Sequence, residues 1–320
     1  MIKIDLITGF LGSGKTTFIK LYAAYLMRQG QRIGILENDY GAVNVDMLLL
    51  RDLEGDNCGL EMVSGACDAD CHRRRFKTKL IALAMSGFDR VLIEPSGIFD
   101  VDEFFDVLHE SPLDRWYEPG SVITVADART ERGLSRASDY LLASQAAVAG
   151  KIVLSKTQLA AAEDIQRTIT HLNGALAAVS CDRRITRDDV LTKPWSELDD
   201  NDFAMLTRCG YTKASFVKHL TEHDNRFGTL YYMDRHYALK PLSEAVRMMM
   251  ADVSCGEVFR VKGFVRENGA WTELNATREQ LRVSPAAAGQ DIVIVIGENL
   301  NGEVIEAYLN NAAAAKEETE

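Results

Sequence analysis

The sequence contains no apolar run of about 18 residues, the length expected of a membrane-spanning helix, so no membrane span is expected. Basic residues are also in deficit: 36 Lys and Arg stand against 47 Asp and Glu, which gives a formal net charge of −11 at pH 7. Such a chain has no broad basic surface with which to neutralise nucleic-acid phosphates. Membranes and nucleic acids are therefore not expected as partners.

Cysteine is sparse and scattered, with six residues in a chain of 320. This usage indicates reduced thiols, leaves metal ligation open and disfavours a disulfide framework. The first strand-like run begins at Ile2, which leaves no room for a signal peptide, so a cytoplasmic location is expected. With 47% hydrophobic and 26% charged residues, the chain is ordinary globular material that can bury a sizeable core.

What the sequence does contain is a G-x-x-x-x-G-K-T motif at residues 9–16, between a short apolar strand and an amphipathic helix. This is the setting that a nucleotide-binding P-loop requires. Its glycines let successive N–H groups surround the α- and β-phosphates, while Lys15 reaches the β/γ oxygens and the Thr16 hydroxyl is placed for Mg²⁺. A plain glycine turn is the alternative, and the G-K-T ending disfavours it. The predicted phosphate-binding residues are Gly9, Gly12, Ser13, Gly14, Lys15, Thr16 and Thr17.

Strand-like and helix-like segments alternate over the first two hundred residues. Apolar runs predict strands at 2–8, 33–37, 91–94, 122–127, 152–155 and 177–179. Amphipathic patterns predict helices at 17–28, 73–86, 101–109, 139–149 and 159–173. This alternation predicts an α/β P-loop NTPase fold, with a mostly parallel sheet flanked by helices. Ligands of such sheets bind at the carboxyl ends of the strands, so the loops that follow these strands should share one rim.

Two of these loops carry further candidate residues. Glu94 ends the third predicted strand, where a Walker-B acid would hold Mg²⁺ directly or through water. Gly97 can present its N–H to the γ-phosphate, so the loop would change shape when that phosphate leaves. In the E-N-D-Y-G segment after the second strand, Asp39 or Glu37 could order the Mg²⁺ shell or the attacking water. The predicted catalytic residues are Lys15, Asp39 and Glu94; each carboxylate taken alone could instead be a solvated loop acid.

These motifs resemble those of the CobW-like family of P-loop GTPases, relatives of the urease and hydrogenase nickel-insertion accessory GTPases. The carboxyl-terminal part is also similar, at residues 259–265 and 292–297. The resemblance implies a metallochaperone or metal-insertion GTPase that handles zinc, cobalt or a related ion for a client protein. It further implies that the carboxyl-terminal domain meets the client or responds to the nucleotide state.

The family's C-x-C-C motif is altered here, because Cys67 and Cys71 lie four residues apart with His72 beside them. On a helix, this spacing puts both thiols on one face with their Cβ atoms ~5–6 Å apart. Two thiolates could then share one soft ion, with Cys58, His72 or an aspartate completing a tetrahedral site. The alternative is that these cysteines simply pack in the interior. Zn²⁺ or another transition metal is the expected cargo.

A second departure concerns the nucleotide base. GTPases that resemble this chain read guanine with N/T-K-x-D, whereas the loop after the fifth predicted strand reads S-K-T-Q at residues 155–158. Lys156 can still lie against the base and Ser155 can still hydrogen-bond, but the neutral Gln158 lacks the charge-assisted pairing of an aspartate. The resemblance therefore favours GTP as the bound nucleotide, and ATP is the alternative. A separate alternative is that this loop makes no contact with the base.

The chain length predicts two domains, although a single large α/β domain is an alternative. The predicted parts are a nucleotide-binding domain at 1–185, a connecting region at 186–226, a smaller CobW-like α+β domain at 227–311, and a frayed or disordered tail at 312–320. In the α+β domain the patterns predict strands at 229–233, 258–266, 271–274 and 292–296, and helices at 242–251 and 302–310. An Asn-Gly turn at 268–269 predicts a hairpin.

Together these features predict a nucleotide-dependent metallochaperone or metal-insertion GTPase acting on a client metalloprotein through its carboxyl-terminal domain. Mg²⁺–GTP would order loops 37–46 and 94–97, and hydrolysis would release them and change the geometry of the cysteines between them. Intrinsic turnover should be slow, because no arginine finger is evident. A client-activating NTPase without metal cargo and a P-loop kinase acting on a small molecule remain alternatives, and a homodimer is left open.

Overall fold

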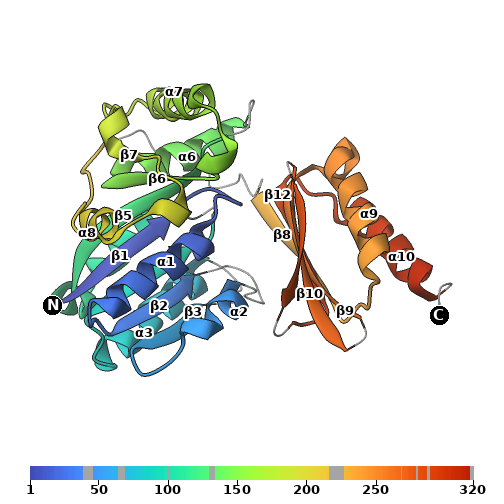
Figure 1. Cartoon of the computed structure of the whole chain (residues 1–320), viewed down its shortest axis with the longest axis horizontal. Coiled ribbons are helices and arrows are strands. Elements are labelled where there is room, and N and C mark those ends of the chain that lie inside the picture. Colours follow the sequence, from blue (N-terminus) through green and yellow to red (C-terminus); the bar gives the residue numbers. More distant parts are fainter. Residues whose placement is uncertain are drawn as a thin grey trace. The chain divides into compact units, whose positions relative to one another are not determined.

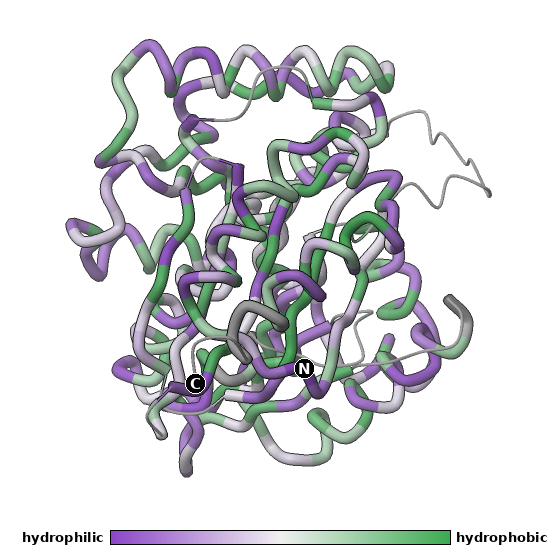
Figure 2. Tube along the Cα trace, turned by 90° about the vertical axis from the view of Figure 1, so that its right-hand side faces the viewer, coloured by the Kyte–Doolittle hydropathy of each residue, from purple (hydrophilic) through white to green (hydrophobic). Residues whose placement is uncertain are grey.

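The computed structural model describes residues 1–38, 46–63, 69–97, 99, 101–129, 134–215, 227–267, 269–278, 280–286 and 289–317. The chain divides into two compact units, Met1–Leu220 and Thr221–Glu320. Figure 1 shows a mixed α/β first unit and a second unit of antiparallel strands with two helices. Of the described helices, none is both long and apolar enough to cross a membrane, and Figure 2 shows polar residues interspersed along them.

The first unit is built on a seven-stranded sheet of order β3-β2-β4-β1-β5-β6-β7, in which neighbouring strands pair in parallel. The strands are β1 (Ile2–Thr8), β2 (Ile33–Asn38), β3 (Cys58–Val63), β4 (Arg90–Pro95), β5 (Tyr117–Asp127), β6 (Lys151–Ser155) and β7 (Val190–Leu191). All residues of β2 and of β4 are buried, as expected for strands covered on both faces. The predicted α/β class and parallel sheet are confirmed.

Helices cover both faces of this sheet (Figure 1). They are α1 (Lys15–Arg28), α2 (Asp46–Leu50), α3 (Ala69–Met85), α4 (Val101–Leu108), α5 (Leu113–Trp116), α6 (Arg136–Val148), α7 (Ala162–Ala178) and α8 (Asp200–Leu206). Successive strand residues point to opposite faces, so in β4 Ile93 belongs to the same apolar cluster as Phe76 of α3, whereas Leu92 belongs to the cluster that contains Phe18 of α1. A further apolar cluster joins α6 and α7 to β5 and β6.

One predicted strand in this unit was wrong, and several short elements, β3 and β7 among them, were not predicted. Residues 177–179 do not form a strand, because α7 runs through Ala178. Such a short apolar run does not by itself distinguish a buried strand from a helix end. The edge strand β3 was not predicted, since its pattern of partly exposed residues lacks both a continuous apolar run and a clear alternation.

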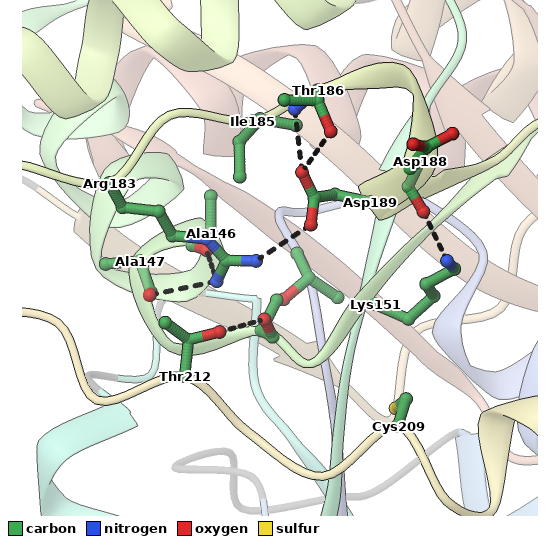
Figure 3. Close-up of polar contacts among 12 residues, drawn as sticks. Ala146, Ala147, Lys151, Arg183, Ile185, Thr186, Asp188, Asp189, Cys209 and Thr212 are labelled. Atoms are coloured by element: carbon green, nitrogen blue, oxygen red, sulfur yellow. Dashed lines mark hydrogen bonds and ion pairs between the residues drawn. The ribbon is translucent and has the colours of Figure 1, made fainter.

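Residues 186–215, the described part of the predicted connecting region 186–226, contribute structure to the first unit. Figure 3 shows how residues 183–189 are held: the Arg183 guanidinium donates to the carbonyl oxygens of Ala146 and Ala147 at 2.8 and 2.9 Å, at the end of α6. A cation is favourable at a helix carboxyl terminus. The Asp189 carboxylate accepts from the Thr186 N–H at 2.7 Å and faces Arg183. β7 then pairs with β6, so a boundary at residue 185 would cut through one packed structure.

The segment after β7 also packs on the first unit. The rings of Tyr22 and Tyr25 on α1 stack against Phe203 of α8, with centroids 6.4 and 5.3 Å apart. The side chain of Trp195 packs on the same cluster from the 3₁₀ helix η4 (Trp195–Glu197). Burial of these aromatic rings explains why the segment folds onto α1 rather than acting as a linker.

The second unit has a five-stranded antiparallel sheet of order β11-β10-β9-β12-β8, with α9 and α10 sharing one apolar cluster with its strands (Figure 1). Its elements are β8 (Phe227–Met233), α9 (Leu239–Ala251), β9 (Glu257–Glu267), β10 (Ala270–Thr277), β11 (Leu281–Ala286), β12 (Ile292–Glu298) and α10 (Gly302–Glu317). Ala270 pairs with Glu267, which confirms the hairpin. β11 was not predicted, and α10 continues to Glu317 because Ala312 is buried in the core.

Candidate nucleotide and metal site

The carboxyl ends of the parallel strands form one rim in the first unit. In register, Thr8 of β1 pairs with Thr124, Glu37 of β2 pairs with Glu94, and Asp127 of β5 pairs with Ser155. The P-loop follows β1, the Gly97 loop follows β4, and the predicted base loop follows β6. The sheet therefore brings the predicted nucleotide-binding segments to the same edge.

The P-loop backbone requires glycine where the motif places it. Gly9, Gly12 and Gly14 have φ values of 149°, 72° and 97°, in the region that favours glycine. A Cβ on Gly9 would lie only 2.1 Å from the carbonyl oxygen of Val125. Gly14 is the amino-terminal cap of α1 and supplies no side-chain acceptor, so the backbone N–H groups of the first turn can bind an anion.

The predicted P-loop side chains lie on the first turn of α1. Lys15 Nζ donates to the Gly9 carbonyl oxygen at 3.1 Å, so its ammonium group lies over the loop. Thr16 Oγ1 donates to Glu94 Oε1 at 2.8 Å, and both residues are buried. A hydroxyl and a carboxylate are the oxygen ligands that Mg²⁺ prefers, so this pair fits the ion. Ser13 is also buried at the loop, whereas Thr17 is exposed.

The loop after β4 contacts three other elements. A Cβ on Gly97 would lie 2.7 Å from the backbone nitrogen of Leu11, so Gly97 packs directly on the P-loop. Its carbonyl oxygen accepts from Gln145 Nε2 of α6 at 3.1 Å, and the Ser96 N–H donates to the Asn38 carbonyl oxygen at 2.9 Å. A displacement of Gly97 would therefore alter its contacts with the P-loop and with α6, and the contact of the same loop with the end of β2.

Sequence reasoning missed Gln145. This residue is fully buried within the apolar face of α6, and its Oε1 has no hydrogen-bond partner among the residues that the structure describes. The donor and the acceptor of a buried side-chain amide are usually both hydrogen-bonded. The unpaired oxygen of Gln145, on the amide that donates to Gly97, therefore makes this residue a candidate for a functional role. The only signal in the sequence was a glutamine within a run of small residues, A-S-Q-A-A-V, and that signal does not indicate a partner.

The loop after β6 holds the predicted base-reading residues. Ser155 is buried, and its hydroxyl donates to the Ala126 carbonyl oxygen at 3.4 Å. Lys156 has φ of 56°, and its ammonium forms an ion pair with the Asp127 carboxylate. Gln158 is exposed on the 3₁₀ helix η2 (Thr157–Leu159). The structure thus fixes Ser155 and Lys156 by contacts to the end of β5 and leaves Gln158 on the surface.

The predicted cargo-metal ligands are not all brought together. Cys58 begins β3, and a six-residue strand spans about 16 Å, so this thiol lies far from the rim where β3 ends. It is 1% exposed, and burial, together with Glu54, raises the pKa of its thiol to about 11. Inclusion of Cys58 in the metal site is therefore corrected, because a buried neutral thiol at the opposite end of the strand cannot join the others.

Cys71 and His72 lie in the first turn of α3, on the rim side of the sheet. Cys71 is half-buried, whereas His72 is fully buried with its Nδ1 3.9 Å from Glu103 Oε1 on α4. Within the described part of the chain, no group of three or more His, Cys, Asp or Glu side chains could hold a metal ion. Cys67 and the predicted catalytic Asp39 lie outside the described residues.

Two family matches cover most of the chain. Residues 3–181 match the CobW/HypB/UreG nucleotide-binding domain, and residues 231–313 match the cobalamin synthesis protein CobW carboxyl-terminal domain. The second match begins within β8 and ends within α10. Each of the two structural units therefore contains one of the matched domains.

Curated relatives are named for zinc. The zinc chaperone YeiR of Escherichia coli (strain K12) is 30% identical over 167 residues, covering 52% of this chain and 50% of that protein. The zinc chaperone YjiA of the same organism is 26% identical over 185 residues, covering 54% and 55%. The chain spans about half the length of these two relatives. The zinc-regulated GTPase metalloprotein activator 1 of Schizosaccharomyces pombe is 24% identical over 353 positions, covering 94% and 83%.

Proposed function

Since the chain belongs to the CobW/HypB/UreG family, we propose that it is a metallochaperone GTPase that couples Mg²⁺–GTP hydrolysis to delivery of Zn²⁺ to a client metalloprotein. The observation that carries the proposal is the hydrogen bond between Thr16 and Glu94, which joins the P-loop helix to the end of β4. It unites the two oxygen groups that such a GTPase needs beside the phosphates. The names of the relatives support zinc as the cargo.

In this proposal each P-loop group has a separate task. The N–H groups at the start of α1 hold the phosphates, and the Lys15 ammonium, already turned over the loop, neutralises charge on the β- and γ-oxygens. Thr16 and Glu94 would hold Mg²⁺, which when bound offsets the negative charge that develops between the β- and γ-phosphates. Asp39 is proposed to order the attacking water. GTP is favoured over ATP, with weak discrimination because Gln158 is neutral.

The structure offers a route from the nucleotide to the cysteine segment. The Gly97 loop is hydrogen-bonded to the Asn38 carbonyl oxygen at the end of β2, and Asn38 pairs in register with Val63 of β3. Val63 is the last residue of β3 before the segment that contains Cys67. Loss of the γ-phosphate would therefore move the Gly97 loop against the strand pair that leads into the cysteines.

A helix contact supports the same coupling. α3 begins at Ala69, between Cys67 and Cys71, and α4 begins after the Gly97 loop. His72 in the first turn of α3 faces Glu103 in the first turn of α4. A shift of α4 would then be transmitted to the start of α3, where Cys71 lies. We place Zn²⁺ on Cys67 and Cys71 in one nucleotide state and assign client contact to residues 231–313, the CobW carboxyl-terminal domain.

The experiment is a competitive Zn²⁺ titration of the reduced protein, residues 1–320, with a non-hydrolysable GTP analogue or with GDP. Wild type should bind one Zn²⁺ with affinities that differ between the two nucleotides, since coupling requires a difference. The Cys67→Ala and Cys71→Ala variants should lose Zn²⁺ binding. The Cys181→Ala variant, which replaces a buried cysteine beyond α7, should retain it. Equal Zn²⁺ affinity in both nucleotide states would refute the coupling. A protein that binds nucleotide but no metal would instead be a client-activating NTPase.

A further inference from the structure

An aromatic side chain with no role in the predicted site, Trp195, lies against the P-loop. It begins η4, shortly after β7. Its Cη2 and Cζ3 atoms are 3.1 and 3.5 Å from the point that a Cβ on Gly14 would occupy. Gly14 is the amino-terminal cap of α1, so the six-membered ring of the indole borders the backbone expected to hold phosphates.

The indole is held firmly in this place. Its Nε1 donates to the Leu154 carbonyl oxygen at 2.9 Å, and Leu154 immediately precedes the base-loop residue Ser155. The Cβ of Ser155 is 3.8 Å from the same point above Gly14. The ring of Phe18 supports the indole, with centroids 5.6 Å apart and planes inclined by 59°. The P-loop, the end of β6 and η4 thus meet at one aromatic side chain, which is half-buried.

This position would lie between the two ends of a nucleotide bound as proposed. If the phosphates lie on the P-loop and the base reaches the loop at 155–158, the nucleoside must pass beside Gly14 and Ser155. We propose that Trp195 forms a wall of the base pocket and contacts the purine ring of the bound nucleotide. The inference rests on the proposed nucleotide binding and deepens it.

The chemistry of this contact sets the specificity. Every nucleobase has a π-face, so aromatic contact stabilises guanine and adenine to a similar degree. The chain also lacks the base-reading aspartate, and Gln158 in its place is exposed. Trp195 therefore supplies affinity for the purine without selecting between purines. We expect the ratio of GDP to ADP affinity to be insensitive to this side chain.

Fluorescence gives the first test. The chain has only three tryptophans, so replacing two of them isolates the emission of Trp195. Trp116→Phe combined with Trp271→Phe leaves Trp195 as the sole tryptophan, and neither replaced residue belongs to the proposed site. Titration with GDP and with ADP should each change the Trp195 emission, whereas pyrophosphate should change it little. An emission that responds to pyrophosphate as strongly as to GDP, or that does not respond to GDP at all, would overturn the inference.

Calorimetry on Trp195→Leu and Trp195→Phe gives the second test, with Trp271→Phe as the matched control in the other unit. Trp195→Leu should weaken GDP and ADP binding by about 10-fold each and leave pyrophosphate binding unchanged. Trp195→Phe should recover most of the affinity. An equal loss for pyrophosphate would show that Trp195 only supports the P-loop, and would refute the contact. Wild type that binds pyrophosphate and nucleotides equally would also refute it, while wild type that binds neither would overturn the proposed function itself.

Discussion

The Thr16 hydroxyl donates a 2.8 Å hydrogen bond to Oε1 of Glu94, across 78 residues of sequence. The contact exists because parallel strands deliver their carboxyl ends to one rim, where α1 also begins. Glu94 is 3% exposed, so its carboxylate is held in a place where little water competes for it. A buried carboxylate at this position is costly unless a partner stabilises its charge, and Mg²⁺ would be such a partner.

Glu94→Gln should abolish the Mg²⁺ dependence of GTP binding and slow GTP hydrolysis by about 100-fold, because it removes the anionic oxygen while keeping the shape. Single-turnover phosphate release in a series of Mg²⁺ concentrations measures both effects. Thr78→Ala, on the exposed face of α3, is the control and should leave the rate unchanged. Hydrolysis by Glu94→Gln at the wild-type rate would remove Glu94 from the catalytic set.

Gln145→Leu should loosen the Gly97 loop, because the Gly97 carbonyl oxygen loses its donor at 3.1 Å. The loss should cost about 1 kcal/mol in free energy of unfolding, as for a typical buried hydrogen bond. Amide exchange of Glu94, Ser96 and Gly97 measures the loop directly. We expect faster exchange and a smaller difference between the GTP-analogue and GDP states than in wild type. Unchanged exchange in both states would show that Gln145 is a packing residue alone.

Glu103→Gln should weaken the coupling between nucleotide and metal while leaving each binding event intact. It alters the group that faces His72 across the α3–α4 contact and replaces neither a P-loop residue nor a cysteine. The ratio of Zn²⁺ affinities in the GTP-analogue and GDP states should move toward one. The comparison variant is Glu244→Gln, on the exposed face of α9. If the affinity ratio stays at its wild-type value, the signal travels through β2 and β3 instead.

Cys58→Ala should retain stoichiometric Zn²⁺, because Cys58 lies at the amino end of β3, away from the rim. In native wild type a thiol reagent at pH 8 should leave Cys58 unmodified, since burial raises the pKa of its thiol to about 11. Mass spectrometry of the labelled protein measures this. Rapid labelling of Cys58, or loss of metal in the alanine variant, would return this residue to the metal site.

Glu110 should contribute stability that depends on pH. Hydrogen bonds from Lys77 and from Arg73 hold the pKa of its carboxyl below the ordinary value. The folded form thus has the lower pKa, so the contribution is complete above the unfolded pKa and is lost as the pH falls through the folded pKa. Since the side chain is 36% exposed, solvent screening limits the contribution to less than about 1 kcal/mol.

Urea unfolding of wild type and Glu110→Gln measures this contribution at pH 7 and again below about pH 4. The variant should be slightly less stable at pH 7, and the difference should vanish at the acidic pH. The exposed Glu244→Gln provides the comparison, with no difference expected at either pH. A deficit of Glu110→Gln that grows on acidification would contradict the assigned direction of the pKa.

The sequence by itself determined the P-loop, the alternation of strands and helices, and the meeting of Lys15, Thr16 and Glu94 at one rim. These follow from local rules: glycines where the backbone needs positive φ, apolar runs that become buried strands, and a parallel topology that aligns strand ends. Short or mixed segments escaped such rules, as the edge strand β3 and the helical residues 177–178 show.

Only the tertiary structure decided which distant side chains touch. Nothing in the residue pattern links Gln145 to Gly97 or Trp195 to Gly14, because each contact depends on how a helix or a loop packs against the finished sheet. Cys58 is a further example. Its residue type made it a candidate metal ligand, but it begins β3 and therefore lies at the end of the strand away from the metal site. Local chemistry is encoded within a few residues, whereas these contacts arise from packing that the whole first unit determines together.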